Sequence, residues 1–231
     1  MPKIYLMLKS IFLVPPLQRG QGGFLVLLQD IVMIKGAGII LGGGRGSRIG
    51  QDKCLMRLDG KPIFEIVLGK LKPLVNEIIL VTNAPQHFAE ASEFRIVTDE
   101  IPHQGPLGGI LAGLSFSSHK YNLVVACDMP FLNTGLIKFL FSEISDADVV
   151  VPCSDEGIEP LHAIYSKDCL PAIRSKLESG KKRVISFFDE VKIKYVDKEK
   201  VKEFDPDYRS FFNINTGDDW KSAKKMFKRG S

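Results

Sequence analysis

Gly36-Ala37-Gly38-Ile39-Ile40-Leu41-Gly42-Gly43-Gly44-Arg45-Gly46-Ser47-Arg48-Ile49-Gly50-Gln51-Asp52-Lys53 joins a short apolar segment to a glycine-rich loop. Residues 37–41 have the length and the β-branched content of a buried parallel strand. The glycines allow backbone N–H groups to approach an anion without interference from a Cβ atom, and Arg48 and Lys53 add positive charge. The stretch therefore predicts a phosphate-binding loop at the carboxyl end of a strand.

This loop differs from two common phosphate-binding motifs. No Gly-Lys-Ser/Thr follows its glycines, so the lysine does not open a helix beside a hydroxyl as in a P-loop. The spacing of residues 42–46 also differs from the fingerprint that holds a dinucleotide pyrophosphate. A tight glycine turn with solvated basic residues is the alternative without a ligand.

The composition is typical of a globular protein. Hydrophobic residues make up 45% and charged residues 25% of the chain, which favours neither disorder nor a membrane protein. The formal net charge of +4 suits an enzyme that handles polyphosphates, but it is equally compatible with a solvated surface. No stretch interleaves basic and aromatic residues, so we expect no nucleic-acid partner.

The cysteines and histidines show no metal-binding pattern. The cysteines lack C-x-x-C spacing, and we expect reduced thiols in a cytoplasmic protein rather than a zinc site. The scattered histidines are typical of surface and packing residues. These residues are Cys54, Cys127, Cys153 and Cys169, and His87, His103, His119 and His162.

Residues 1–32 differ in character from the rest of the chain. An apolar run interrupted by Lys9 leads to a proline- and glycine-containing segment over residues 15–23. A signal peptide, with Lys3 as its charged region, is one interpretation. We expect instead an N-terminal extension that is disordered or lies upstream of the true start at Met33, because export would separate an enzyme that handles polyphosphates from its substrate.

Several motifs beyond this extension resemble one group of enzymes. Residues 41–44, 47–50 and 52–53, followed by Leu58-x-Gly60-Lys61-Pro62, are similar to the signature of nucleotidyltransferases that use a nucleoside triphosphate and release pyrophosphate. Within this group the motifs most resemble the molybdenum cofactor guanylyltransferase family. The resemblance implies a three-layer α/β/α Rossmann-like fold with a mostly parallel sheet, and a single nucleotidyltransferase domain over residues 33–231.

Apolar strand patterns alternate with helical patterns from Met33 onward, as in a parallel sheet covered on both faces. Strands are predicted at residues 77–82, 94–97, 122–127, 148–152, 159–165 and 191–196. Helices are predicted at residues 61–71, after Gly105, at residues 169–177 and after Thr216. Thr216 is a natural N-cap residue, and Asp219 three positions later completes an acidic capping pattern. Pro130 is expected to end a strand and start a helix, and residues 198–208 to form a charged surface connection.

Further motifs place the nucleotide in the first half of the chain. Asn83 and Asp99 follow predicted strands, where open parallel sheets contact ligands. Residues 105–114 resemble the Gly-Pro-Leu element of the family, which implies that Gly105, Leu107 and Gly108 lie beside the nucleotide. An asparagine turn before Pro85 and a plain strand-to-helix turn remain the alternatives for these two motifs.

Asp128 is the predicted metal ligand. It follows a strongly apolar strand, and a carboxylate at that place is costly to bury unpaired, so a cation such as Mg²⁺ is expected there. The family's Cys-Asp-x-Pro motif matches at this position and implies the same role for Asp128, and Asp99 is a further candidate for the same ion. An N-cap for the next helix is the alternative.

The second half of the chain is expected to bind the acceptor. Lys182 and Arg183 could contact a phosphate, although a charge run can equally be a solvated surface. Residues 212–220 resemble the family's Asn-x-Asn-Thr signature, with Gly217 in place of proline and Trp220 in place of leucine. This resemblance makes Asn213 and Asn215 candidates for acceptor binding.

Taken together, the resemblance implies transfer of GMP from GTP to molybdenum-molybdopterin with release of pyrophosphate. The nucleotide would contact the backbone of Leu41, Gly42, Gly43 and Gly44. Arg48 and Lys53 would stabilise charge on the departing pyrophosphate, and Asp128 would hold Mg²⁺. Expected partners are the two substrates and the proteins that deliver the cofactor or receive it, with no membrane association.

Two other functions remain open at this point. A related transferase that uses CTP on molybdopterin, or a nucleoside triphosphate on a sugar phosphate, would share the glycine loop and Asp128. A non-catalytic accessory protein would keep the fold and the nucleotide pocket but release no pyrophosphate. The Asn-x-Asn-Thr ending favours the guanylyltransferase, and the joint presence of Arg48, Lys53 and Asp128 disfavours the accessory protein.

Overall fold

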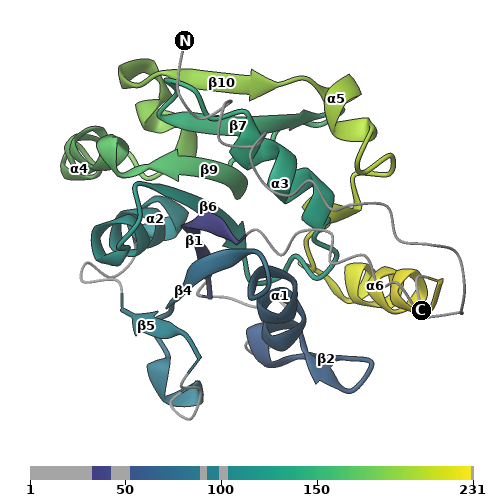
Figure 1. The fold of residues 1–231 in the computed structure, drawn as a ribbon. Helices are drawn as coiled ribbons and strands as arrows, with labels where there is room; N and C mark the ends of the chain where they lie inside the picture. The colour runs from purple at the N-terminus through teal and green to yellow at the C-terminus, as the bar shows by residue number, and fades with distance from the viewer. Residues whose placement is uncertain (1–32, 43–52, 89–92, 99–103, 230–231) are drawn as a thin grey trace, which may run out of the picture. The chain divides into compact units, whose positions relative to one another are not determined.

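The computed structural model describes residues 33–42, 53–88, 93–98 and 104–229. In these residues one β-sheet carries α-helices on both faces (Figure 1). Its strands are β1 (Ile34–Leu41), β4 (Val75–Val81), β5 (Arg95–Val97), β6 (Tyr121–Ala126), β7 (Val149–Ser154), β8 (Gly157–Ile158), β9 (His162–Ser166) and β10 (Ile193–Val196), and a separate hairpin contains β2 (Arg57–Leu58) and β3 (Lys61–Pro62).

The helices fall into two groups by type. The α-helices are α1 (Ile63–Leu71), α2 (Gly105–Phe116), α3 (Thr134–Ser142), α4 (Leu170–Glu178), α5 (Lys198–Lys202) and α6 (Gly217–Arg229). The 3₁₀ helices are η2 (Lys53–Leu55), η3 (Pro85–His87), η4 (Lys167–Cys169), η5 (Val184–Glu190) and η6 (Arg209–Phe211). No helix in the described part of the chain is long and apolar enough to span a membrane.

The strand order is β10-β7-β9-β6-β1-β4-β5, and β8 pairs with β7. β1 runs parallel to both of its neighbours, β4 and β6, and the β4–β5 and β10–β7 pairs are parallel as well. β9 is antiparallel to β6 and β7. The prediction of a mostly parallel α/β sheet is therefore confirmed.

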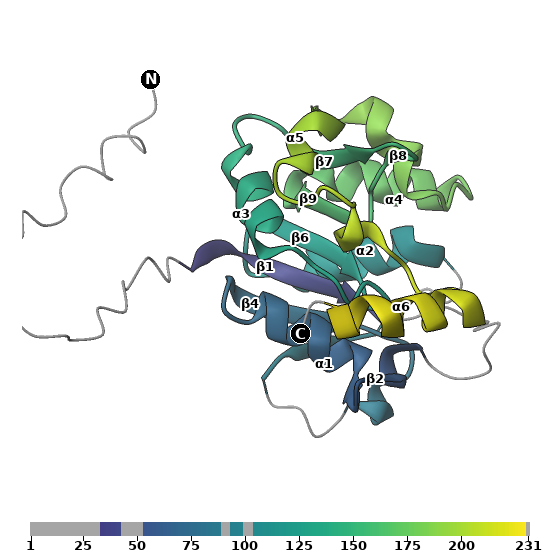
Figure 2. The ribbon, with the colours of Figure 1, turned by 90° about the vertical axis from the view of Figure 1, so that its right-hand side faces the viewer.

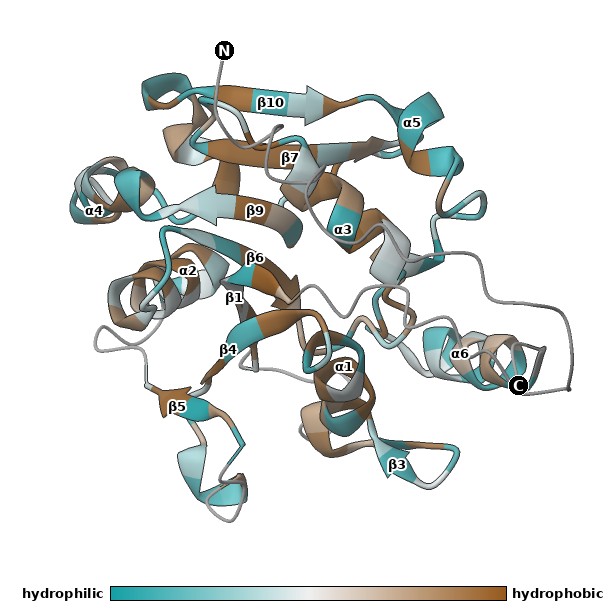
Figure 3. Ribbon diagram, viewed as in Figure 1, coloured by the Kyte–Doolittle hydropathy of each residue, from teal (hydrophilic) through white to brown (hydrophobic). Residues whose placement is uncertain are grey.

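Successive residues of the central strands pack on opposite faces of the sheet, as the pleat requires. Ile39 and Val124 belong to the core beneath α2 and α4, whereas Ile40 and Val125 belong to the core beneath α1 and α3. Figure 1 shows these two helix pairs on opposite sides of the sheet, and Figure 3 shows the apolar character of the strands between them. This double burial explains why the strands are continuously apolar in sequence.

The C-terminal helix α6 returns to the first half of the fold. It contacts β2, and Figure 2 shows it on the same side of the sheet as α1. Its acidic first turn, with Asp218 and Asp219, suits the positive end of the helix dipole. As a result, residues just before α6 lie near residues that follow β1.

Most predicted elements are present within two or three residues of their expected ends. The differences are local. Lys61 and Pro62 form β3, so the helix starts at Ile63, and the charged connection after Lys198 contains the short helix α5. Pro130 does not start α3, because Asn133 is the N-cap residue of that helix. The predicted extension over residues 1–32 lies outside the described residues.

Candidate active site

Three parallel strands end side by side at one edge of the sheet. Leu41, Val81 and Ala126 share one register at the ends of β1, β4 and β6. The N–H of Gly42 donates to the carbonyl of Val81 over 2.8 Å, and the N–H of Cys127 donates to that of Leu41 over 3.0 Å. The chain runs from β1 to β4 and β5 on one side and returns to β6 on the other, so this edge is a topological switch point, where open α/β sheets bind ligands.

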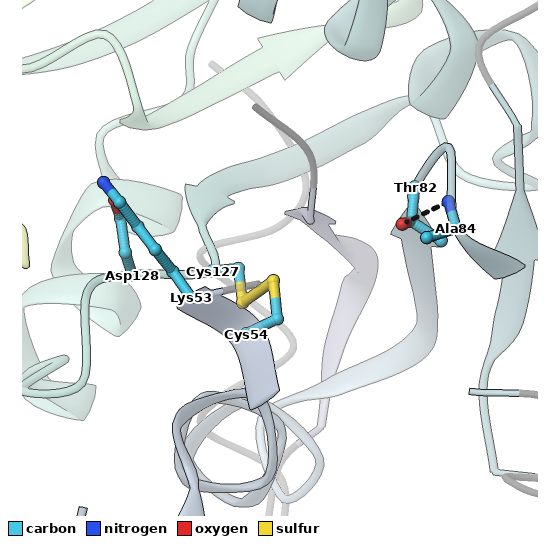
Figure 4. Close-up of a disulfide and its surroundings, with 6 residues drawn as sticks. All are labelled: Lys53, Cys54, Thr82, Ala84, Cys127 and Asp128. Atoms are coloured by element: carbon cyan, nitrogen blue, oxygen red, sulfur yellow. Dashed lines mark hydrogen bonds and ion pairs between the residues drawn. A yellow bond between two sulfur atoms is a disulfide. The ribbon is translucent and has the colours of Figure 1, made fainter. Parts of the chain in front are cut away.

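Lys53 and Asp128 meet at this edge (Figure 4). The Nζ atom of Lys53 lies 3.1 Å from Oδ2 of Asp128 and donates to Oδ1 of Asn215 over 2.6 Å. The side chains of Lys53 and Asp128 are 22% and 18% exposed, so the ion pair can be reached from solvent. The fold thus brings together three predicted site residues from η2, from the loop after β6 and from the segment before α6.

Asn215 is held in place by the first turn of α6. Oδ2 of Asp219 accepts hydrogen bonds from the N–H groups of Asn215 (2.9 Å) and Thr216 (2.7 Å), and the N–H of Asp219 donates to Oγ1 of Thr216 over 3.1 Å. The predicted Thr216–Asp219 capping pair is therefore confirmed. Desolvation raises the pKa of Asp219, but its hydrogen bonds with Asn215 and Thr216 outweigh this effect, and the net pKa is lowered.

The backbone of Asp128 is also fixed. The N–H of Ile214 donates to its carbonyl over 3.1 Å, which ties the segment before α6 to the loop after β6. The alternative that Asp128 caps the next helix is wrong, because Oδ1 of Asn133 accepts the N–H of Leu136 at the start of α3. The Asp128 carboxylate instead faces the ammonium group of Lys53.

Cys54 and Cys127 are joined by a disulfide beside this ion pair (Figure 4). The expectation of reduced thiols is therefore wrong for these two residues. They are 73 positions apart, and nothing in the sequence between them indicates that η2 packs against the end of β6. Cys153 and Cys169 are free, as expected. Burial, with a contribution from Asp148, raises the pKa of the Cys169 thiol to about 12.

The start of α2 forms a second part of the predicted site. Gly105 has a φ of +66°, in the left-handed region that favours glycine. Leu107 is fully buried and packs in the core beneath α2, so its side chain does not face a ligand. Gly108 is buried as well. Of Gly105, Leu107 and Gly108, therefore, only backbone atoms could contact a nucleotide.

A pocket of about 670 Å³ opens beside this turn. Lys182 and Arg183, predicted to bind the acceptor, are part of its lining, and most of the other lining residues are apolar. Pro106, Pro160 and Leu161 belong to stretches that resemble the family, whereas the sequence reasoning missed the apolar residues from β8 and η5, which carry no ligand motif. The lining residues are Gly105, Pro106, Glu156, Ile158, Pro160, Leu161, Lys182, Arg183, Val184 and Ile185.

The remaining predicted residues are separate from the Lys53–Asp128 pair or not described. Asn83 is exposed after β4, where Oγ1 of Thr82 accepts the N–H of Ala84 over 3.1 Å and stabilises the turn (Figure 4). Nδ2 of Asn213 donates to the carbonyl of Phe211 over 2.8 Å, so its side chain stabilises a local turn. Gly43, Gly44, Arg48 and Asp99 lie outside the described residues.

The donor set around Asp128 suits a hard cation shared with a phosphate substrate. Over residues 33–42, 53–88, 93–98 and 104–229, no group of three or more His, Cys, Asp or Glu side chains could hold a metal ion. Mg²⁺ is usually held by one or two carboxylates together with phosphate oxygens and water. The partly exposed carboxylate of Asp128 is compatible with Mg²⁺ that is bound together with a triphosphate.

The sequence is similar to that of named molybdenum cofactor enzymes. The probable molybdenum cofactor guanylyltransferase of Peptoclostridium acidaminophilum is 36% identical over 188 residues, which covers 78% of this chain and 85% of that protein. The molybdenum cofactor guanylyltransferase of Desulfosudis oleivorans is 35% identical over 195 residues, with 84% and 96% coverage.

Solved structures agree with this relationship. The molybdopterin-guanine dinucleotide biosynthesis protein A of Archaeoglobus fulgidus is similar with a TM-score of 0.74 and 29% identity, over 84% of this chain and 99% of that chain. The 4-diphosphocytidyl-2C-methyl-D-erythritol synthase of Anaerococcus prevotii, at 16% identity and a TM-score of 0.63 over 84% of this chain and 96% of that chain, shares the fold alone. The family model described as the MobA-like NTP transferase domain matches residues 38–193. With most of its length matched and its switch-point site in place, the chain belongs to the MobA-like NTP transferase family.

Proposed function

We propose that this chain is a molybdenum cofactor guanylyltransferase, which transfers GMP from GTP to molybdenum-molybdopterin, releases pyrophosphate and forms the guanine dinucleotide cofactor. The observation that carries the proposal is the meeting of Lys53, Asp128 and Asn215 at the switch point of the sheet. The names of the relatives at about 35% identity support the choice of substrates.

The reaction needs little covalent help from the protein. An oxygen of the acceptor's terminal phosphate attacks the α-phosphorus of GTP, a new P–O bond forms, and the bond to the oxygen that bridges the α- and β-phosphates breaks. That oxygen leaves with pyrophosphate. Because a phosphate monoester is largely ionised near neutral pH, the protein mainly has to position the reactants and compensate charge.

Lys53 and Asp128 compensate each other's charge before the substrate binds. Leaving either charge unpaired at a partly buried site would be unfavourable. A triphosphate offers Lys53 new anionic partners, and a cation bound with that triphosphate offers a new partner to Asp128. The ion pair can therefore open without an uncompensated charge, and Lys53 is then placed to stabilise the negative charge that develops on pyrophosphate.

Asp128 is the described residue that would hold Mg²⁺, and Asp99 is proposed as a second ligand. When bound, the ion neutralises part of the triphosphate charge. The glycine-rich segment, Gly42 to Gly44, is proposed to contact the nucleotide with its backbone, and Arg48 to share the role of Lys53. Asn83, Gly105, Leu107 and Gly108 are proposed to line the nucleotide site, the last three through their backbone.

The pocket beside α2 is the proposed acceptor site. β7 is antiparallel to β9, and β9 is antiparallel to β6, so β7 ends at the same edge of the sheet as Asp128. The pocket contains residues of the β7–β8 connection and of η5. Lys182 and Arg183 are suited to the acceptor phosphate, and the apolar lining to its ring system. Asn213 and Asn215 are proposed to complete this side.

Residues 33–231 are proposed to form the single catalytic domain, in agreement with a family match that starts at residue 38. Because GTP is a cytoplasmic substrate, we propose a cytoplasmic location. The product is proposed to pass to apoenzymes, and proteins that deliver molybdenum-molybdopterin are the corresponding upstream partners.

The choice of nucleotide is tested by calorimetric titration of the protein with GTP, CTP, UTP and ATP, each with Mg²⁺. We expect binding of GTP in clear preference to the others, and pyrophosphate release when molybdenum-molybdopterin is added. A preference for CTP would leave the proposed nucleotide site unchanged but would indicate transfer of CMP in place of GMP. Binding of nucleotide without pyrophosphate release would indicate an accessory protein.

The role of Asp128 is tested by Asp128→Asn, which keeps the shape of the side chain but removes its charge. We expect turnover to fall at least a hundredfold and Mg²⁺ to lose its effect on GTP affinity, because the cation loses its protein ligand. Asp146→Asn is the matched control, since Asp146 is paired with Lys192 on the surface and its side chain is 82% exposed. Retained Mg²⁺-dependent turnover in Asp128→Asn would contradict the assignment.

A further inference from the structure

The disulfide partners are the immediate neighbours of the two charged residues in the candidate site. Cys54 follows Lys53 in η2, and Cys127 precedes Asp128 after β6. The Cα atoms of the two cysteines are 5.7 Å apart. The covalent link therefore joins the two backbone segments that carry the Lys53–Asp128 ion pair (Figure 4).

The same link lies against the start of the glycine-rich segment. A Cβ atom added to Gly42 would lie 3.4 Å from Sγ of Cys54 and 2.8 Å from Cδ1 of Leu80. On the other side, the N–H of Cys127 donates to the carbonyl of Leu41, which directly precedes Gly42. The disulfide thus lies at three of the segments that the proposed function assigns to the nucleotide, namely the end of β1 with Gly42, η2 and the loop after β6.

Without the disulfide, η2 is connected to the end of β6 by weaker contacts. One of them is the side chain of Lys53 itself, which reaches Asp128 and Asn215. That contact has to open when Lys53 binds a phosphate. In the reduced protein, η2 would therefore lose its direct attachment to Asp128 at the moment when the ligand needs both residues in place.

We propose that Cys54 and Cys127 form a reversible thiol–disulfide couple that controls the affinity of the site for a magnesium-bound nucleoside triphosphate, with the disulfide as the high-affinity form. This inference rests on the proposed function, because it assumes that Lys53 and Asp128 contact that ligand. The physical reason is pre-organisation: the cross-linked backbone segments have less freedom to lose when the ligand binds.

The chemistry is an ordinary thiol–disulfide exchange with a low-molecular-weight thiol. A thiolate attacks one sulfur of the Cys54–Cys127 bond and forms a mixed disulfide, and a second thiol resolves it. Two electrons and two protons pass to the protein, which gains two thiols, while the two small thiols are joined as a disulfide. Both cysteine residues are 3% exposed, so exchange requires a local opening of the structure.

Linkage requires that the effect be reciprocal. If the disulfide form binds the nucleotide more tightly by some factor, then the bound nucleotide favours the disulfide over the dithiol by the same factor. This equality gives two independent measurements of one quantity. A merely structural disulfide would stabilise the fold but would leave the thiol–disulfide equilibrium insensitive to the nucleotide.

The first experiment measures Mg²⁺–GTP affinity by calorimetry for the full chain in its disulfide and dithiol forms, each verified by mass spectrometry of the peptides that contain Cys54 and Cys127. We expect the dithiol form to bind at least fivefold more weakly. Cys54→Ala should match the dithiol form in both oxidising and reducing buffer, and its circular dichroism should show that it is folded. Cys153→Ala, which removes a free thiol, should respond to reductant as the unaltered chain does.

The second experiment measures the fraction of disulfide in a glutathione redox buffer with and without saturating Mg²⁺–GTP. We expect the equilibrium to shift toward the disulfide by the factor found in the calorimetry. Equal affinity of the two redox forms, or no shift with nucleotide, would overturn the inference and leave the proposed function intact. Absence of nucleotide binding in both forms would instead refute the proposed function, and the coupling with it.

Discussion

Among the residues that the structure describes, Lys53 has two hydrogen-bond partners, the carboxylate of Asp128 and the amide oxygen of Asn215. Its ammonium group is therefore held in one position by residues that are far apart in sequence. The amide keeps the lysine near Asp128 without adding a second negative charge. A pre-positioned cation of this kind can stabilise a developing pyrophosphate without reorganisation during the reaction.

We therefore expect Lys53→Ala to lower kcat/KM for pyrophosphate release by about 10²–10³-fold, as is usual when one pre-organised charge or donor is removed. The variant should remain folded, because only a partly exposed side chain is lost. Lys192→Ala is the matched control, since Lys192 forms an exposed ion pair with Asp146 and should retain full activity. Unchanged turnover in Lys53→Ala would remove its proposed role.

The burial of His162 makes the free energy of unfolding depend on pH. Its ring is fully buried, lies 5.2 Å from the ring of Phe211, and neither nitrogen has a hydrogen-bond partner among the described residues. Desolvation lowers its pKa from 6.5 to about 4, although the charge of Asp205 acts in the opposite direction. The neutral ring is therefore the form that the fold accommodates.

Below pH 6.5 the unfolded chain binds a proton at His162, whereas the folded chain does not bind it until about pH 4. The free energy of unfolding therefore has its full value above pH 6.5 and decreases as the pH falls toward 4. The expected loss from this residue between pH 7 and pH 4 is about 3 kcal/mol. Urea unfolding at several pH values measures it. His162→Leu should show a correspondingly shallower dependence, and an identical slope in the two proteins would contradict the assignment.

Helix α2 packs closely on β1 through Gly113. A Cβ atom at this position would lie 2.5 Å from Cγ2 and 3.0 Å from Cδ1 of Ile39. Ile39 is fully buried and β-branched, so it has little freedom to move away. This approach sets the distance between the helix and the central strand and helps to place the start of α2 at the ligand edge of the sheet.

Gly113→Ala should therefore reduce the free energy of unfolding by about 1–3 kcal/mol, despite the better helix propensity of alanine. Gly69→Ala in α1 is the matched control, because a Cβ atom there would meet nothing within 4 Å. That substitution should stabilise the protein by about 0.5–1 kcal/mol. Thermal and urea unfolding distinguish the two, and equal effects at both positions would refute the packing argument.

The Cys54–Cys127 disulfide acts on the molecule as a whole. It closes a segment of 73 residues that contains α1, β4, β5, α2 and β6. A cross-link of this span reduces the conformational entropy of the unfolded chain. Its effect on stability is therefore distinct from its proposed effect on nucleotide affinity.

Reduction should lower the free energy of unfolding by about 4 kcal/mol, the value expected for a closed loop of this size. The measurement is urea unfolding followed by the fluorescence of Trp220, the single tryptophan, with and without reductant. Cys54→Ala should show no response to reductant, whereas Cys153→Ala should respond fully. If the urea midpoint of the unaltered chain did not change with reductant, the cross-link would not reduce the conformational entropy of the unfolded chain.

The sequence was informative wherever a feature depends on near neighbours in the chain. The apolar strands, the glycine-rich segment after β1, the helix that starts at Gly105 and the Thr216–Asp219 cap are all local patterns, and the structure contains the corresponding strands, helix and cap. The family resemblance, carried by short ordered motifs, is confirmed by the comparisons. The β9 strand was expected as a strand, but nothing in its pattern indicated an antiparallel direction.

Features that depend on contacts between residues distant in the chain could not be predicted from local sequence patterns. Asn215 contacts Lys53 across 162 positions, and neither this contact nor the Cys54–Cys127 pairing nor the apolar lining from Ile158 has a local signature. The sequence alone determined the order of the elements and the residue types at their ends, because propensity and burial act over a few residues. Only the tertiary structure decided which of those ends meet, because that depends on strand order and on packing across the whole sheet.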